Sequence, residues 1–171
     1  MSRKLEYCTN TQEIGNRISV ANQISGLKKK NLPLITQKRL TLEMIAEKYN
    51  YIYKIYTDGS IINKIVGFGY YDPQEKISYS GRLKPGFTIM SAEIVAIAKA
   101  IEYVNSKNIT NVTIFSDSKS ACTLLHNLHT DNALVVDLIN QIIKSNISKV
   151  QIQWIPGHIN LLGNDKADEA A

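Results

Sequence analysis

The sequence lacks a long apolar run, a leader-like N-terminus and clustered cysteines. No apolar stretch approaches the roughly 18 residues that a membrane-spanning helix needs. The opening residues, MSRKLEYCTNTQ, contain no apolar core segment and no small-residue cleavage site, so we expect no secretory signal. Cys8 and Cys122 lie far apart without metal-type spacing, which predicts free thiols in a reducing compartment. These absences predict an intracellular protein, cytoplasmic or nuclear, that is neither secreted nor inserted in a membrane.

The excess of basic over acidic residues is confined to the first third of the chain. The 171 residues carry a formal net charge of +5. Residues 1–50 hold nine Lys and Arg against four Glu, whereas residues 51–171 hold eleven residues of each sign. In residues 1–32 most side chains are polar, and the few apolar ones do not recur at regular spacing. We therefore expect residues 1–50 to be a basic, partly disordered linker or extension. Such a segment attracts phosphates, although a solvated leader explains Lys28-Lys-Lys30 equally well.

Apolar periodicity predicts one folded domain over residues 51–171, preceded by a short helix at 41–48. Strand patterns lie at 51–57, 65–71, 76–83, 111–116 and 149–154, and helix patterns at 91–105, 119–127, 133–145 and 164–171. The order predicts an α/β fold with a mixed five-stranded sheet, three antiparallel meander strands and then two more, with helices packed on it. The last helix would have barely one turn and would be too short to be stable unaided.

Four acidic residues come from four separate elements of this predicted domain: Asp58, Glu93, Asp117 and Asp168. Singly, Asp58 and Glu93 have ordinary explanations, as a turn Asp in the Asp58-Gly59 dipeptide and as a first-turn Glu favoured by the helix dipole. Together they can converge where strands end. Like charges about 4 Å apart repel by about 4 kcal/mol at an effective dielectric near 20, so a cation is expected between them. Oxygen ligands suit Mg²⁺ or Mn²⁺, and two such ions support phosphodiester hydrolysis.

The motifs around these acids resemble those of the type 1 ribonuclease H family. They are YTDGS at Asp58, SAE at Glu93, FSDSKSA at Asp117 and WIPGHxxxxGNxxAD ending at Asp168. The style of the match, especially WIPGH and GNDKAD, is most like the ribonuclease H domain attached to the reverse transcriptases of non-LTR retrotransposons. The resemblance covers residues 51–171 and implies an RNase H-like catalytic domain.

The resemblance implies an endonuclease that cuts the RNA strand of RNA/DNA hybrids with two Mg²⁺ ions, for which Mn²⁺ is a substitute. Asp58, Glu93, Asp117 and Asp168 would be the metal ligands, and Asp165 is the acid held in reserve. His158 matches a family histidine thought to aid proton transfer or product release, although a loop histidine without a role remains the alternative. The expected partners are the hybrid and a reverse transcriptase domain in a longer chain, with the protein itself a monomer.

The candidate substrate-binding residues are Gly59, Ser60, Asn63, Thr88 and Lys119. Gly59 and Ser60 lie beside the site, where the 2′-OH distinguishes RNA from DNA. Thr88 matches a family phosphate-binding threonine, and the single tryptophan, Trp154, is read as a core residue.

Two departures from the family pattern favour an alternative function. The segment between Asp117 and His158 lacks the basic protrusion with which bacterial members grip the hybrid, and the last helix is short. A non-catalytic module that binds nucleic acid or connects domains therefore stays open, as does a DNA-cutting nuclease on the same fold. The four intact acids favour an enzyme over the module, and the histidine loop favours ribonuclease H over the DNA nuclease.

Overall fold

The computed structural model describes residues 11–27, 32–127 and 130–171; Cys8 and Lys28-Lys-Lys30 lie outside this part. Its elements are α1 (Thr11–Arg17), β1 (Ile18–Ala21), α2 (Leu34–Tyr49), β2 (Tyr53–Ile62), β3 (Ile65–Asp72), β4 (Ile77–Arg82), α3 (Ile89–Ser106), β5 (Asn111–Ser116), α4 (Lys119–His126), α5 (Ala133–Lys144), β6 (Lys149–Trp154) and α6 (Leu162–Ala170). The expected α/β class and mixed sheet are confirmed. Within the described ranges, no helix combines the length and apolarity needed to cross a membrane.

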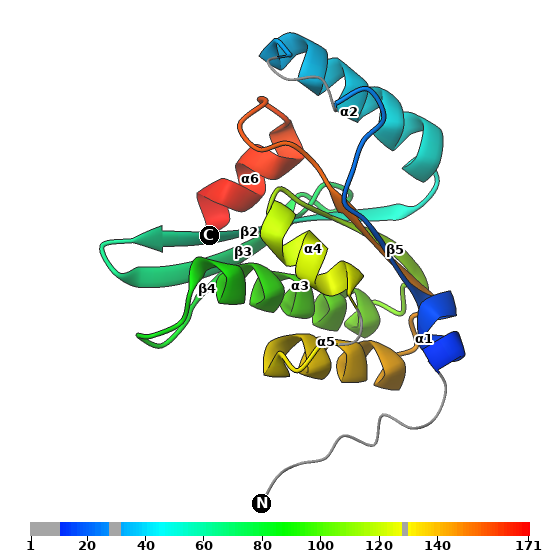
Figure 1. The fold of residues 1–171 in the computed structure, drawn as a ribbon, viewed down its shortest axis with the longest axis vertical. Coiled ribbons are helices and arrows are strands. Elements are labelled where there is room, and N and C mark those ends of the chain that lie inside the picture. The colour runs from blue at the N-terminus through cyan, green and yellow to red at the C-terminus, as the bar shows by residue number, and fades with distance from the viewer. Residues whose placement is uncertain (1–10, 28–31, 128–129) are drawn as a thin grey trace, which may run out of the picture.

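The sheet has six strands in the order β1-β6-β5-β2-β3-β4 (Figure 1). Strands β2, β3 and β4 form the expected antiparallel meander. Strands β5, β6 and β1 continue the sheet in parallel with β2. The predicted bounds of β5 and β6 are confirmed residue for residue.

Successive residues of the central strands point to opposite faces, and each face is covered by helices. On one face, Ile55 of β2 and Ile114 of β5 pack with the apolar sides of α3, α4 and α5. On the other face, the next residues, Tyr56 and Phe115, pack with α2 and α6, with their ring centroids 5.0 Å apart. The result is a sheet between two helical layers, visible in Figure 1.

The expectation of an irregular linker over residues 1–32 is wrong for residues 11–21. Strand β1 pairs in parallel with β6, with Ile18 opposite Val150, and adds a sixth strand to the predicted five. Arg17 secures this pairing because its guanidinium donates to four main-chain carbonyls in the last turn of α5 and just after it: those of Ile142, Ile143, Ser145 and Ile147. A four-residue strand held by such long-range contacts has little local signal in the sequence.

The first meander strand also differs from the expectation, because it does not stop at Asp58. Strand β2 runs on to Ile62, and the chain turns at Asn63 and Lys64, whose φ angles are 51° and 67°. Two successive residues with positive φ are typical of a tight hairpin turn. Asp58 therefore lies within a strand, paired with Gly69, rather than at a strand end.

Two predicted helices are longer than the sequence patterns indicated. Helix α2 begins at Leu34 instead of residue 41. Helix α6 has nine residues, and its buried Ala167 packs into the cluster beneath α2, so it is more than the single unsupported turn expected. It lies close over the sheet because β3 has glycines below it: a β-carbon on Gly67 or Gly69 would collide with the last two alanines of the chain.

Candidate metal centre

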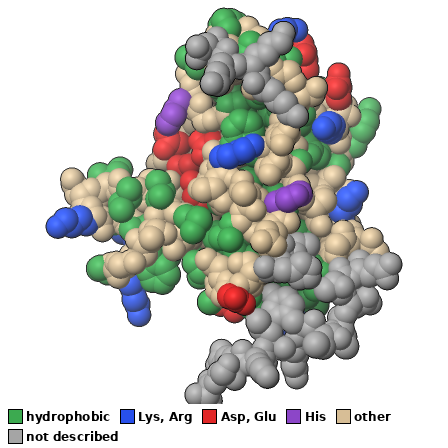
Figure 2. All heavy atoms as spheres, in the orientation of Figure 1, with side chains coloured by type: hydrophobic (Ala, Val, Ile, Leu, Met, Phe, Trp, Pro, Cys, Tyr) green, Lys and Arg blue, Asp and Glu red, His purple; other side chains and the backbone are tan. Residues whose placement is uncertain are grey.

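Three of the four predicted acids meet at one point of the molecule. Asp58, Glu93 and Asp117 each offer a carboxylate oxygen, and these oxygens all lie within 4.8 Å of one another. Asp58 and Glu93 are buried, with 6% and 4% of their surfaces exposed, and Asp117 is half-buried. Figure 2 shows acidic side chains gathered in one patch with a histidine at its rim.

Strand pairing and a close helix contact bring these acids together. Thr57 of β2 lies opposite Ser116 of β5, so Asp58 and Asp117 are the next residues along two adjacent parallel strands. Glu93 reaches them because α3 crosses directly over Gly59. A β-carbon at position 59 would lie 2.7 Å from the backbone nitrogen of Glu93, so only glycine permits this approach.

Burial and the mutual repulsion of the carboxylates raise the pKa values of Asp58 and Glu93. Burial, followed by the negative charges of Asp117 and Asp168, raises the pKa of Asp58 to about 8. Burial, followed by the charges of Asp58 and Asp117, raises the pKa of Glu93 to about 9. The backbone amide of Gly59 opposes both shifts by hydrogen bonding. Without a cation, the site therefore retains protons at neutral pH.

The donor set fits a hard divalent cation. All three ligating groups are carboxylates, which Mg²⁺ and Mn²⁺ prefer over softer ligands. In the described part of the chain, Glu93 Oε2 is buried without a hydrogen-bond partner, although such atoms are normally satisfied. A cation between the carboxylates would satisfy this oxygen and offset their mutual repulsion.

Asp168 lies at the edge of this group rather than within it. It is exposed on α6, and it contributes to the raised pKa of Asp58 by charge and by a hydrogen bond. Asp165, the reserve acid, is half-buried in the first turn of α6. Glu169 forms an exposed ion pair with Lys166, as a solvent-facing helix residue does.

Three residues around Asp117 were not predicted as parts of the site. Asn164 Nδ2 donates to Asp117 Oδ2 at 3.1 Å, and Trp154 Nε1 donates to the main-chain oxygen of Asp117 at 3.1 Å. A β-carbon on Gly157 would lie 2.6 Å from Asp117 Oδ2. All three belong to the WIPGHxxxxGNxxAD motif, so the motif could have marked them as candidate site residues. Their position around Asp117 follows only from the fold.

His158 projects from the loop between β6 and α6. Its side chain is exposed, and its φ of 55° is unusual for a residue other than glycine. Ile155 and Ile159 on either side are buried.

The predicted substrate-binding residues divide into two groups by position. Gly59 and Ser60 directly follow Asp58, and Lys119 follows Asp117 by two residues, with its ammonium 4.4 Å from the centre of the Trp154 ring. Trp154 is half-buried and packs against the main apolar cluster, as expected of a core residue, and its indole also contacts Lys119 and the main-chain oxygen of Asp117.

The other two substrate candidates have structural roles. Thr88 is the N-cap of α3, and its hydroxyl accepts from the Ser91 amide at 3.1 Å. Asn63 forms the hairpin turn, about 16 Å along the strand from Asp58 at roughly 3.3 Å per residue.

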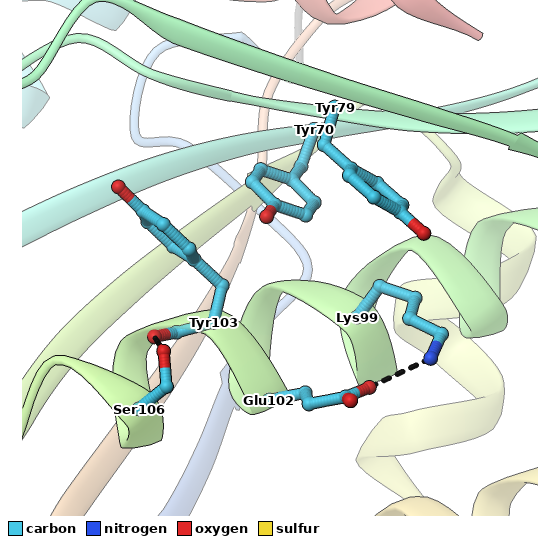
Figure 3. A pocket seen from close by; sticks show the side chains of 6 residues that line it. All are labelled: Tyr70, Tyr79, Lys99, Glu102, Tyr103 and Ser106. Carbon is cyan, nitrogen blue, oxygen red and sulfur yellow. Dashed lines mark hydrogen bonds and ion pairs between the residues drawn. The ribbon is translucent and has the colours of Figure 1, made fainter.

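A separate pocket of about 210 Å³ lies between the meander and α3 (Figure 3). It is lined by Tyr70, Tyr79, Lys99, Glu102, Tyr103 and Ser106. None of the clustered acids lines it, so it is not part of the metal centre.

Comparison with known families agrees with this geometry. The family model described as RNase H matches residues 50–171, which include all four acids and the histidine loop. The chain therefore belongs to the RNase H family. A search of curated proteins found no match.

Proposed function

We propose that this protein hydrolyses the RNA strand of RNA/DNA hybrids with the help of divalent cations. The observation that carries the proposal is the group of three carboxylates with the unpartnered Glu93 Oε2, in a chain of the RNase H family. Three acidic oxygens within 4.8 Å repel one another when they are ionised, and a bound cation would offset that repulsion.

Asp58, Glu93 and Asp117 would hold the cation, with Asp168 as a fourth ligand at the exposed edge of the site. Two Mg²⁺ ions, or Mn²⁺ in their place, would supply an activated water and stabilise charge on the phosphate. Asn164 would keep the Asp117 carboxylate turned toward its neighbours. His158, exposed beside the site, would exchange a proton with the reacting groups or assist product release.

Substrate contacts are proposed for the residues nearest the acids. Gly59 and Ser60 would meet the RNA backbone, and Lys119 would contact a phosphate. Thr88 would contact a phosphate through the hydroxyl that already caps α3. Asn63 would reach only a part of the hybrid far from the cleavage point.

The proposed setting is a retrotransposon-derived polyprotein in which a reverse transcriptase domain supplies the hybrid. The proposal rests on the style of the WIPGH and GNDKAD motifs, which carry His158 and Asp168. The part of the chain matched to the family carries no net charge apart from its histidines, so the basic residues of the first 50 would contribute to hybrid affinity.

The test is cleavage of a hybrid labelled separately on each strand, by the wild type and by Asp58→Asn. We expect Mg²⁺-dependent cutting of the RNA strand alone, and loss of cutting in the variant. Equal cutting of the DNA strand would instead indicate a DNA nuclease. Tight hybrid binding without cutting in either Mg²⁺ or Mn²⁺ would indicate a non-catalytic binding module.

A further inference from the structure

Residues 18–27 and 32–49 precede the family match, yet they pack against the loop between β6 and α6 that carries His158. Ile24, Met44, Ile45 and Tyr49 share one buried apolar cluster with Ile155, Ile159 and Leu161 of the His158 loop and with Ala167 of α6. Figure 1 shows α2 lying over α6 and the loop that precedes it.

A buried polar network reinforces this contact at the start of the loop. Gln153 is fully buried, and its Oε1 accepts from the Tyr49 hydroxyl at 2.8 Å. Its Nε2 lies 3.4 Å from the main-chain oxygen of Ala21 and 3.3 Å from that of Gln23. Gln153, near the end of β6, is therefore hydrogen-bonded both to the end of α2 and to residues at and after the end of β1.

The loop itself depends on such outside support. Residues 155–161 form neither helix nor strand, and both His158 and Asn160 have positive φ angles, 55° and 56°. Positive φ costs free energy in residues other than glycine, so surrounding contacts must stabilise it. The buried side chains of Ile155, Ile159 and Leu161 alternate with the exposed ones of His158 and Asn160 and supply those contacts.

We propose that four buried side chains of the N-terminal segment, those of Ile24, Met44, Ile45 and Tyr49, act as a clamp that positions the His158 loop and α6 for the reaction. This inference rests on the proposed function, because it assigns the clamp a role through His158 and Asp168. Residues of the clamp are positioning residues and touch no substrate. Loosening the clamp would let the loop sample other conformations and would lower kcat more than it raises KM.

The test compares two alanine variants on the same helix. Met44→Ala removes a buried clamp side chain, whereas Leu42→Ala removes one that is 45% exposed. In Met44→Ala, we expect amide hydrogen exchange at 157–163 to accelerate at least about tenfold, with protection of β5 and β6 retained. We expect kcat to fall about tenfold with KM changed less than twofold, and Leu42→Ala to behave as wild type.

Two further variants separate the possible outcomes. Ile45→Val is a milder change for use if Met44→Ala does not fold, and Tyr49→Phe removes only the hydroxyl that donates to Gln153. Unchanged loop exchange in the folded variants would overturn the clamp, as would a uniform increase across the whole sheet. If the wild type fails to cleave hybrids but the loop exchange still rises selectively, the proposed function fails and the physical clamp remains.

Discussion

The acid cluster predicts an unusual response to mutation: removing a buried carboxylate should stabilise the metal-free protein. Asp58, Glu93 and Asp117 place oxygens within 4.8 Å, where each ionised pair repels by at least about 3.5 kcal/mol at an effective dielectric near 20. The protein avoids part of this repulsion by retaining protons. Because the number of retained protons changes with pH, the free energy of unfolding depends on pH.

The sign and size follow from the pKa of Asp58, which rises from 3.8 to about 8 on folding. A raised pKa gives a stability contribution that is present below pH 4 and is lost as pH rises toward 8. At pH 7, the loss for one such group is about 4 kcal/mol. Because the Asn amide must still be buried, we expect Asp58→Asn to recover about 1–3 kcal/mol of it.

Thermal unfolding with a chelator present measures this effect. A gain of 1–3 kcal/mol corresponds to a Tm rise of about 2–12 °C for a chain of this size. The rise should grow between pH 5 and pH 8, while Asp137→Asn, an exposed change on α5, should have little effect. Saturating Mg²⁺ should raise the wild-type Tm and abolish the advantage of the variant. A lower Tm for Asp58→Asn without metal, or a gain independent of pH, would refute the reasoning.

Three further predictions concern the surroundings of the site. Asn164→Ala should weaken Mg²⁺ affinity about 10–100-fold, measured by calorimetry, because Asp117 loses the donor that orients it; unchanged affinity would remove Asn164 from the site. Gly157→Ala should greatly reduce hybrid cleavage, since its β-carbon would lie 2.6 Å from Asp117 Oδ2, whereas Gly15→Ala, with nothing within 4 Å, should not. Replacing Lys28-Lys-Lys30 with glutamines should weaken hybrid binding more at 50 mM than at about 200 mM salt in a titration; equal affinity at low salt would make the tract a passive linker.

The sequence predicted the features that depend on local pattern. Asp117 was placed correctly after β5 because an alternation of apolar residues ends there at a polar run. Asp58 was placed at a strand end because Asp-Gly is a frequent turn signal, whereas here Gly59 serves the approach of Glu93 and the turn falls at Asn63.

Features held by distant contacts were not predictable. Strand β1 depends on Arg17 reaching the end of α5, and its four residues have no periodicity of their own. The length of α6 depends on the burial of Ala167 beneath α2. The same long-range packing links Ile24 and α2 to the loop before α6, although composition alone indicated a linker.

The central claim is tested most directly by Glu93→Gln, which keeps the shape of the side chain and removes its charge. Single-turnover cleavage of an RNA-labelled hybrid should be measured for the wild type and this variant, in Mg²⁺ and in excess chelator. We predict cutting by the wild type in Mg²⁺ only, and at least about a hundredfold slower cutting by the variant. Undiminished cutting by Glu93→Gln, or by the wild type in chelator, would contradict the account.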